Sequence, residues 1–184
     1  DEDLNNDTLF AIEVENFGTS TPMYQSNTTA TAIPDGDLNG VASEIFFCGL
    51  PENLDGCLEI ESLTIDSLVH GWMSDIGLYL VSPAGDTVEL STNNGGTGDN
   101  MFNVVFSDTS SNDITLQTDG IADSTYRTDA VDVSASLYDA QNPNGGWFLV
   151  AVDNAGGFAG TRFAWSLTFV DNSPTPILHY EDTT

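Results

Sequence analysis

The chain has 184 residues, of which 29 are acidic and only two, both arginines, are basic, so its formal net charge at pH 7 is −27. A polyanion of this kind repels phosphate backbones and anionic lipid surfaces, which argues against nucleic acid and membrane surfaces as partners. No apolar run approaches the roughly 20 residues that a membrane helix needs, so membrane insertion is not expected. An apolar fraction of 40% nevertheless suffices for one packed domain with flanking segments.

Composition divides the chain into three parts. Residues 1–32 are acidic and rich in Thr and Asn, which predicts an N-terminal linker, and the apolar stretch Leu9–Ile12 could add an edge strand. Residues 33–171 carry the strand patterns and form the predicted domain. Residues 172–184, with two prolines, predict a C-terminal linker.

Strand patterns recur in chain order within the predicted domain, separated by loops rich in Gly, Pro and Asn. They cover Val41–Cys48, Leu58–Leu68, Ile76–Leu80, Thr87–Ser91, Met101–Phe106, Trp147–Val152 and Phe163–Phe169. The last of these alternates apolar with small or polar residues, as a half-buried strand does. Trp147–Val152 is nearly continuously apolar, which predicts a strand buried on both faces. Short strands with such loops indicate an all-β sandwich or barrel, and the lack of a fixed repeat argues against a propeller or solenoid.

Two cysteines, Cys48 and Cys57, flank a loop that contains Gly, Pro, Asn and Asp. A disulfide across this loop is sterically reasonable and would place the protein in an oxidising, extracellular compartment. Two free thiols are the alternative. A zinc site would require further Cys or His residues nearby, and the sequence has none there.

Several motifs occur in an order and spacing that resemble the P domain (Homo B domain) of subtilisin-like proprotein convertases, in its bacterial form. They are Ile33-Pro34-Asp35 with Asn39-Gly40-Val41, His70-Gly71-Trp72-Met73-Ser74-Asp75-Ile76, Ser82-Pro83-Ala84-Gly85, Gly95 to Phe102, Asn144 to Leu149, Asp153-Asn154 and Trp165 to Phe169. The resemblance covers roughly residues 33 to 171. The departures are modest, with Ser74 where the family often has Gly and Thr128 where a Pro is common.

The resemblance implies a jelly-roll β-sandwich of two antiparallel sheets. It further implies a non-catalytic accessory domain that follows a subtilisin-like catalytic domain in a secreted serine protease, stabilises that domain and binds structural calcium. The fold follows more firmly than the partner, because one fold hosts many functions.

The residues themselves do not indicate catalysis. A serine hydrolase needs a histidine beside a serine, and only His70 and His179 are present, without a Gly-x-Ser-x-Gly motif. We expect His70 to stabilise a turn through Asp75 or the backbone. Carboxylates are abundant, but abundance does not identify the matched pair that a glycosidase needs.

Calcium is the ligand that the residue types suggest, because it prefers carboxylate, amide and carbonyl oxygens in turns. Asp35, Asp37 and Asn39 occupy alternate positions of a loop that contains two glycines, like the start of an EF-hand loop, but Phe46 stands where the loop needs its last Glu. We therefore expect a site of another type. The other candidate ligands are Asp75, Asp99, Asn100, Asp108 and Asp153. The alternative is that these side chains cap turns without a metal.

A rival interpretation is an adhesion or polysaccharide-binding module of an exported bacterial protein, in which exposed aromatic rings stack on sugars. Trp147 and Trp165 lie within strand patterns and are predicted to be core residues. Trp72 lies in a loop-like stretch and could be exposed. Its exposure beside another aromatic residue would favour this interpretation.

Overall fold

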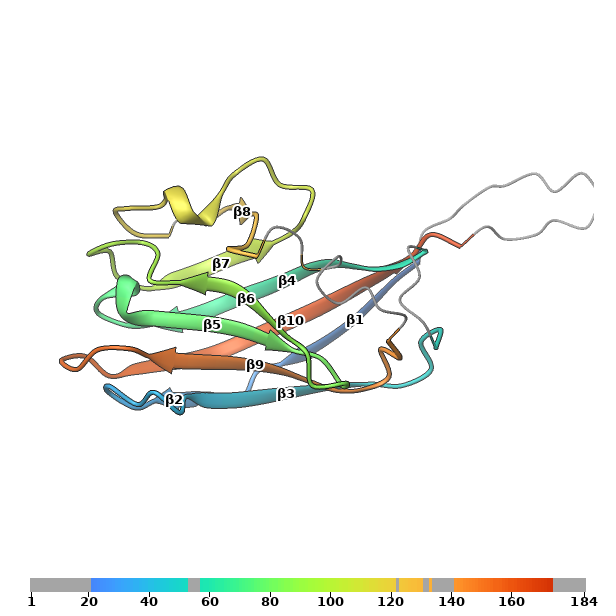
Figure 1. The fold of residues 1–184 in the computed structure, drawn as a ribbon, viewed down its shortest axis with the longest axis horizontal. Coiled ribbons are helices and arrows are strands. Elements are labelled where there is room, and N and C mark those ends of the chain that lie inside the picture. Colours follow the sequence, from blue (N-terminus) through green and yellow to red (C-terminus); the bar gives the residue numbers. More distant parts are fainter. Residues whose placement is uncertain (1–20, 53–56, 122, 131–132, 134–140, 174–184) are drawn as a thin grey trace, which may run out of the picture.

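The computed structural model describes residues 21–52, 57–121, 123–130, 133 and 141–173. Two β-sheets face each other across one core (Figure 1). The elements in chain order are β1 (Thr21–Asn27), β2 (Thr31–Ile33), β3 (Val41–Phe47), β4 (Leu58–Val69), the 3-10 turn η1 (Met73–Asp75), β5 (Ile76–Val81), β6 (Thr87–Thr92), β7 (Met101–Phe106), the 3-10 turn η2 (Ile114–Leu116), β8 (Thr125–Tyr126), β9 (Gly145–Asp153) and β10 (Gly160–Asp171). The all-β sandwich predicted from the sequence is confirmed.

The larger sheet has the strand order β1-β10-β4-β7-β8, with β2 also paired to β10, and the smaller sheet has the order β3-β9-β5-β6. All pairs are antiparallel except the short parallel pair β7–β8. The two longest strands, β4 and β10, pair from Leu58↔Asp171 to Val69↔Thr161 with irregularities in register along the way. This long pair forms the centre of the larger sheet, and the smaller sheet packs over it.

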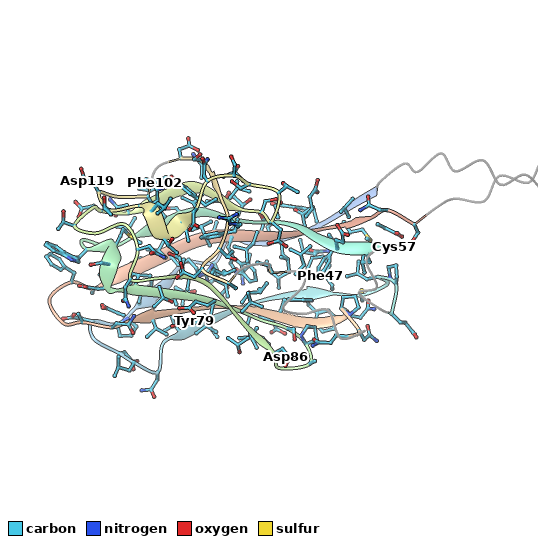
Figure 2. All side chains as sticks on the ribbon, turned by 45° about the horizontal axis from the view of Figure 1, so that its top comes forward. Phe47, Cys57, Tyr79, Asp86, Phe102 and Asp119 are labelled. Atoms are coloured by element: carbon cyan, nitrogen blue, oxygen red, sulfur yellow. The ribbon has the colours of Figure 1, made fainter. Side chains whose placement is uncertain are left out.

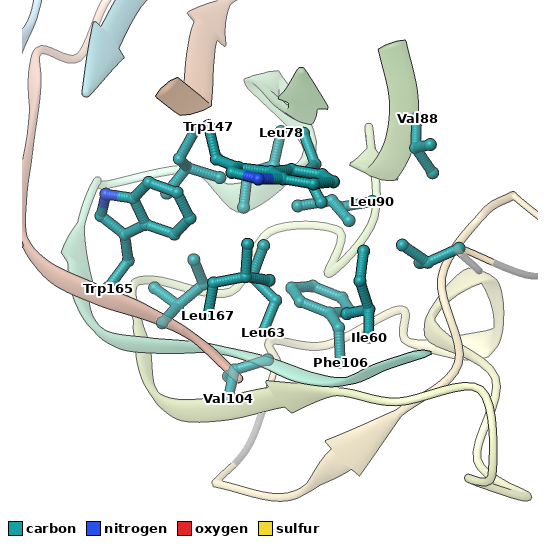
Figure 3. Packing of buried hydrophobic residues seen from close by; sticks show 14 of the residues in the cluster. Ile60, Leu63, Leu78, Val88, Leu90, Val104, Phe106, Trp147, Trp165 and Leu167 are labelled. Carbon is teal, nitrogen blue, oxygen red and sulfur yellow. The ribbon is translucent and has the colours of Figure 1, made fainter. Parts of the chain in front are cut away.

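The core follows from the alternation of side chains along the strands. Trp147 on β9 and Trp165 on β10 are fully buried between the sheets, as predicted (Figure 3). The Trp147 Nε1–H donates to the Pro143 carbonyl at 2.8 Å, and the Trp165 Nε1–H donates to Ser43 Oγ at 3.0 Å. Each buried indole N–H therefore has an acceptor, which buried polar groups need if they are not to cost stability.

The prediction that Trp147–Val152 is buried on both faces is wrong. On β9 the inward side chains Trp147, Leu149 and Ala151 are fully buried, whereas the outward ones between them are half-buried. An antiparallel sheet in a two-layer sandwich has only one covered face, unlike the parallel sheets that carry helices on both.

The first described strand lies within the segment predicted as a linker. β1 pairs with β10 from Thr21↔Asp171 to Asn27↔Trp165 and forms an edge of the larger sheet. The stretch Leu9–Ile12, which could have supplied an edge strand, lies outside the described residues, as do residues 174–184 of the C-terminal segment. The limits of the domain and of its linkers stay predictions.

The loops gather at the two ends of the sandwich. The β2–β3, β4–β5, β6–β7 and β9–β10 loops share one end, on the left in Figure 1, and we call it the four-loop end. Figure 2 places Phe102 and Asp119 toward this end and Cys57 and Asp86 toward the opposite one. Gly95 and Gly96, in the β6–β7 loop, have φ values of 81° and 54°. Glycine adopts a positive φ at little steric cost because it has no Cβ, which suits it to this loop.

Candidate functional site

A buried histidine forms the base of the four-loop end. His70 directly follows β4, and its side chain is fully buried. Its Nδ1 lies 2.9 Å from the Trp72 carbonyl oxygen and 3.2 Å from the Trp72 amide nitrogen. Its Nε2 lies 3.0 Å from the Phe158 carbonyl oxygen and 3.3 Å from Asp153 Oδ2. A single imidazole thus joins the β4–β5 loop, the β9–β10 loop and the end of β9.

Asp153 ends β9 and is also fully buried. Besides contacting His70, it accepts a hydrogen bond through Oδ1 from the Ala155 amide at 3.2 Å. The predicted backbone contacts of His70 are confirmed, but its carboxylate partner is Asp153. Asp75 instead contributes its carbonyl oxygen, which accepts from the Asn154 amide at 2.7 Å. Because protein groups surround both ring nitrogens and water does not reach them, His70 is placed to hold loops together and not to exchange protons with a substrate.

The β2–β3 loop carries the first group of candidate calcium ligands. Asp37 Oδ1 accepts from both the amide and the side-chain nitrogen of Asn39, each at 2.9 Å. Asp35 Oδ1 accepts from the Gly157 amide at 2.6 Å and so ties this loop to the β9–β10 loop. These are the turn-capping contacts of the alternative interpretation. The two carboxylates here organise the backbone around them.

The remaining candidates lie in two places. Asn100 precedes β7, has a φ of 59°, and accepts through Oδ1 from the His70 amide at 3.0 Å, with Asp99 beside it. Asp108 follows β7 and accepts from the Val133 amide at 2.9 Å. The six residues of β7 separate these positions by roughly 20 Å at about 3.3 Å per residue. Asp108 therefore does not share a site with the candidates of the four-loop end.

The candidate ligands do not assemble into a calcium cage. Among the described residues, no three His, Cys, Asp or Glu side chains come together as a group that could hold a metal ion. Asp35, Asp37, Asn100, Asp108 and Asp153 each have at least one side-chain oxygen bonded to an N–H group. Calcium needs six to eight oxygens that converge on one point. The described carboxylates do not form such a group in this structure, and calcium binding remains a prediction from the sequence.

Neither of the two cationic side chains is exposed at the four-loop end. Arg127 pairs with Asp113 at 3.0 Å beside η2, where hydrogen bonds from Thr115 and then Arg127 hold the pKa of Asp113 below its usual value. Arg162 on β10 is buried, and desolvation lowers its pKa. Its Nη2 donates to Thr31 Oγ1 at 2.9 Å. The described surface near His70 therefore presents oxygen acceptors without an exposed arginine.

The two cysteines lie toward the other end of the sandwich. Cys48 is exposed just after β3, and Cys57 is half-buried just before β4, on either side of residues 53–56, which lie outside the described part of the chain. Their pairing as a disulfide stays a prediction.

An aromatic pair lies on top of the buried histidine. Trp72 and Phe158 have ring centroids 6.3 Å apart and planes inclined by 16°, and both rings are partly exposed. The sequence marked Trp72 as a candidate for exposure but missed Phe158. The signal was available: Phe158 is a lone large residue in the turn Gly156-Gly157-Phe158-Ala159-Gly160, where no strand can bury it.

The two sheets that pack face to face make this chain an all-β sandwich protein. A buried His70–Asp153 pair holds the loops together at one end of the sandwich. The family model for the proprotein convertase P-domain matches residues 61–169, more than half of the chain, so the chain belongs to this family. The described residues include no helix long and apolar enough to span a membrane.

Solved structures add a distant likeness. The serine protease of Aeromonas sobria is 16% identical to the chain in two structures, one alone and one in complex with the chaperone ORF2, each with a TM-score of 0.49. The alignments cover 83% and 84% of this chain but only 27% of the protease. No curated protein matches the chain.

Proposed function

We propose that this chain is the non-catalytic accessory domain of a secreted subtilisin-like serine protease, and that it stabilises an adjacent catalytic domain in the same polypeptide. The observation that carries the proposal is the match to the P-domain family over residues 61–169. The surroundings of His70 support it, because this histidine is enclosed by backbone carbonyls and Asp153 instead of facing a substrate. An extracellular location agrees with a net charge of −27, which salt outside the cell would screen.

The partner can be tested by expressing the full-length protein with and without this domain. We expect the truncated protein to mature poorly or to lose peptidase activity on heating at a lower temperature than the intact protein. A matched pair of glycine variants of the full-length protein tests whether disrupting the fold of this domain has the same effect as removing the domain. Gly96→Ala should reproduce the truncation, because a Cβ there lies 2.0 Å from the Thr118 carbonyl oxygen, whereas Gly49→Ala has no atom within 4 Å. A truncated protease that matures normally and keeps its thermal stability contradicts the proposal.

Calcium binding by the loop carboxylates is the second part of the proposal and rests on the sequence. Repulsion among 29 acidic groups makes cation uptake favourable, and any loop that closes around calcium would gain stability from it. The test is a thermal melt in calcium and in EDTA at constant ionic strength, with Asp37→Asn compared with Asp66→Asn, an exposed strand position outside the candidate set. We expect calcium to raise the melting temperature and Asp37→Asn to reduce the rise. An identical midpoint in calcium and EDTA contradicts calcium binding and leaves the accessory role standing.

A further inference from the structure

The four-loop end exposes two neighbouring aromatic rings. Trp72 is 38% exposed and Phe158 is 46% exposed, although both belong to residue types that normally contribute to cores. They come from different loops, β4–β5 and β9–β10, and their rings stack. Two adjacent exposed aromatic rings form a surface that can contact a ligand.

The backbone below the rings is fixed before any ligand arrives. His70 contacts the main-chain oxygens of both Trp72 and Phe158, the two residues that carry the rings. Nδ1 lies within hydrogen-bonding distance of Trp72 and Nε2 within hydrogen-bonding distance of Phe158, so one imidazole holds both loops at once. Binding to a preorganised surface costs less conformational entropy than binding to mobile loops.

Gly71 adds a second restraint on the pair. A Cβ at this position would lie 2.6 Å from Cδ1 of Phe158, so the phenyl ring rests against a site where the chain has no side chain. The pair therefore depends on a histidine below it and on a glycine beside it. Exposed aromatic residues elsewhere, such as Phe46 on β3, have no aromatic partner among the described residues.

The surroundings of the pair indicate the chemistry of its ligand. Asp35 accepts a hydrogen bond from the amide of Gly157, the residue before Phe158, and Asn100 accepts one from the amide of His70, so oxygen acceptors lie on the loops that carry or adjoin the rings. No exposed arginine accompanies them, and the chain has no lysine. A surface of acceptors around apolar rings suits a ligand with an apolar face and many hydroxyl donors, and it repels phosphate, sulfate and carboxylate groups.

We propose that Trp72 and Phe158 form a binding platform for an uncharged polysaccharide. A pyranose ring has the required chemistry, because its C–H face packs on an aromatic ring while its equatorial hydroxyls donate to acceptors at the rim. The anionic surface excludes polyanionic glycans and anionic membranes. This platform is independent of the proposed protease partner: the same domain can stabilise a neighbour and hold it on a substrate surface.

The test is retention of the 184-residue chain on amorphous cellulose, chitin and curdlan, an uncharged (1→3)-β-glucan, with alginate as a polyanionic control. We expect retention on at least one uncharged polysaccharide and none on alginate. Trp72→Ala and Phe158→Ala should each weaken binding by at least about tenfold, which corresponds to about 1.4 kcal/mol. Phe46→Ala, which removes a more exposed aromatic ring outside the pair, should bind like the parent.

Gly71→Ala is the most specific test, because it keeps both aromatic rings and its new Cβ would displace the ring of Phe158. We expect weaker polysaccharide binding and an unchanged thermal midpoint of unfolding. Absence of retention on all three uncharged polysaccharides overturns the proposal. So does retention that Trp72→Ala and Phe158→Ala leave unchanged. Binding to casein or to phosphatidylcholine vesicles that depends on Trp72, without binding to a polysaccharide, also overturns it and identifies the platform as a protein or lipid contact.

Discussion

Replacing Arg162 with methionine should stabilise this domain, although it removes one of only two cations from a strongly acidic chain. Arg162 is 1% exposed, and its Nη2 donates to Thr31 Oγ1. Its Nη1 is buried and has no hydrogen-bond partner among the described residues. No carboxylate among the described residues forms an ion pair with Arg162. The ion pairs found there are His70–Asp153 and Arg127–Asp113. The guanidinium is therefore a buried charge that is only partly compensated.

The expected size of the effect follows from three contributions. A buried donor without an acceptor costs about 1–3 kcal/mol, and methionine removes that cost while filling most of the space. The bonds from Nη2 to Thr31 Oγ1 and, at 3.5 Å, to the Thr29 carbonyl oxygen are lost, but Thr31 is only half-buried and Thr29 is exposed, so water can replace both. The net charge changes from −27 to −28, and the added repulsion is screened beyond about 8 Å at physiological salt. We expect a net gain of about 1–2 kcal/mol, or about 2–8 °C in the thermal midpoint.

The assay is urea unfolding followed by tryptophan fluorescence, which reports the exposure of the buried Trp147 and Trp165. Arg127→Met is the matched control, because it removes the same charge from an exposed pair and should change stability by less than about 0.5 kcal/mol. Arg162→Ala should destabilise, since it removes the charge but leaves a cavity. The reasoning is refuted if Arg162→Met is less stable than the parent by more than about 1 kcal/mol in both low and high salt.

Three further predictions concern the core, one loop and the surface charge. Ser43→Ala removes the acceptor of the Trp165 indole N–H and should cost about 1–3 kcal/mol in urea unfolding; an unchanged midpoint would mean that the N–H finds another acceptor. Gly96→Ala should lower the thermal midpoint far more than Gly49→Ala. Both glycines have positive φ, but only Gly96 has backbone atoms within 3 Å of the new Cβ. Equal losses would mean that the positive φ alone causes the effect. Raising sodium chloride from about 10 mM to 150 mM shortens the Debye length from about 30 to 8 Å, so the thermal midpoint should rise. A midpoint that does not change with salt would show that repulsion among the carboxylates does not limit stability.

The sequence by itself determined the strands, the core tryptophans and the turns. Alternation along Phe163–Phe169 predicts a strand that lies within β10, because side chains on a strand alternate between the two faces of its sheet. Trp147 and Trp165 are core residues for the same reason. The segment Ser82–Gly85 has Pro at its second position and Gly at its fourth, which favours a type I turn, and the Gly85 amide donates to the Ser82 carbonyl oxygen. These features depend on residues close together in the chain.

The tertiary structure decided which distant residues meet. His70 and Asp153 are 83 positions apart, and Trp72 meets Phe158 only because the β4–β5 and β9–β10 loops end on the same side of the sandwich. The pairing of β1 with β10 and the half-burial of the outer face of β9 likewise depend on strand order and on the number of layers. Local patterns carry periodicity but no strand order, so the sequence identified Trp72 as a candidate and only the fold supplied its partner.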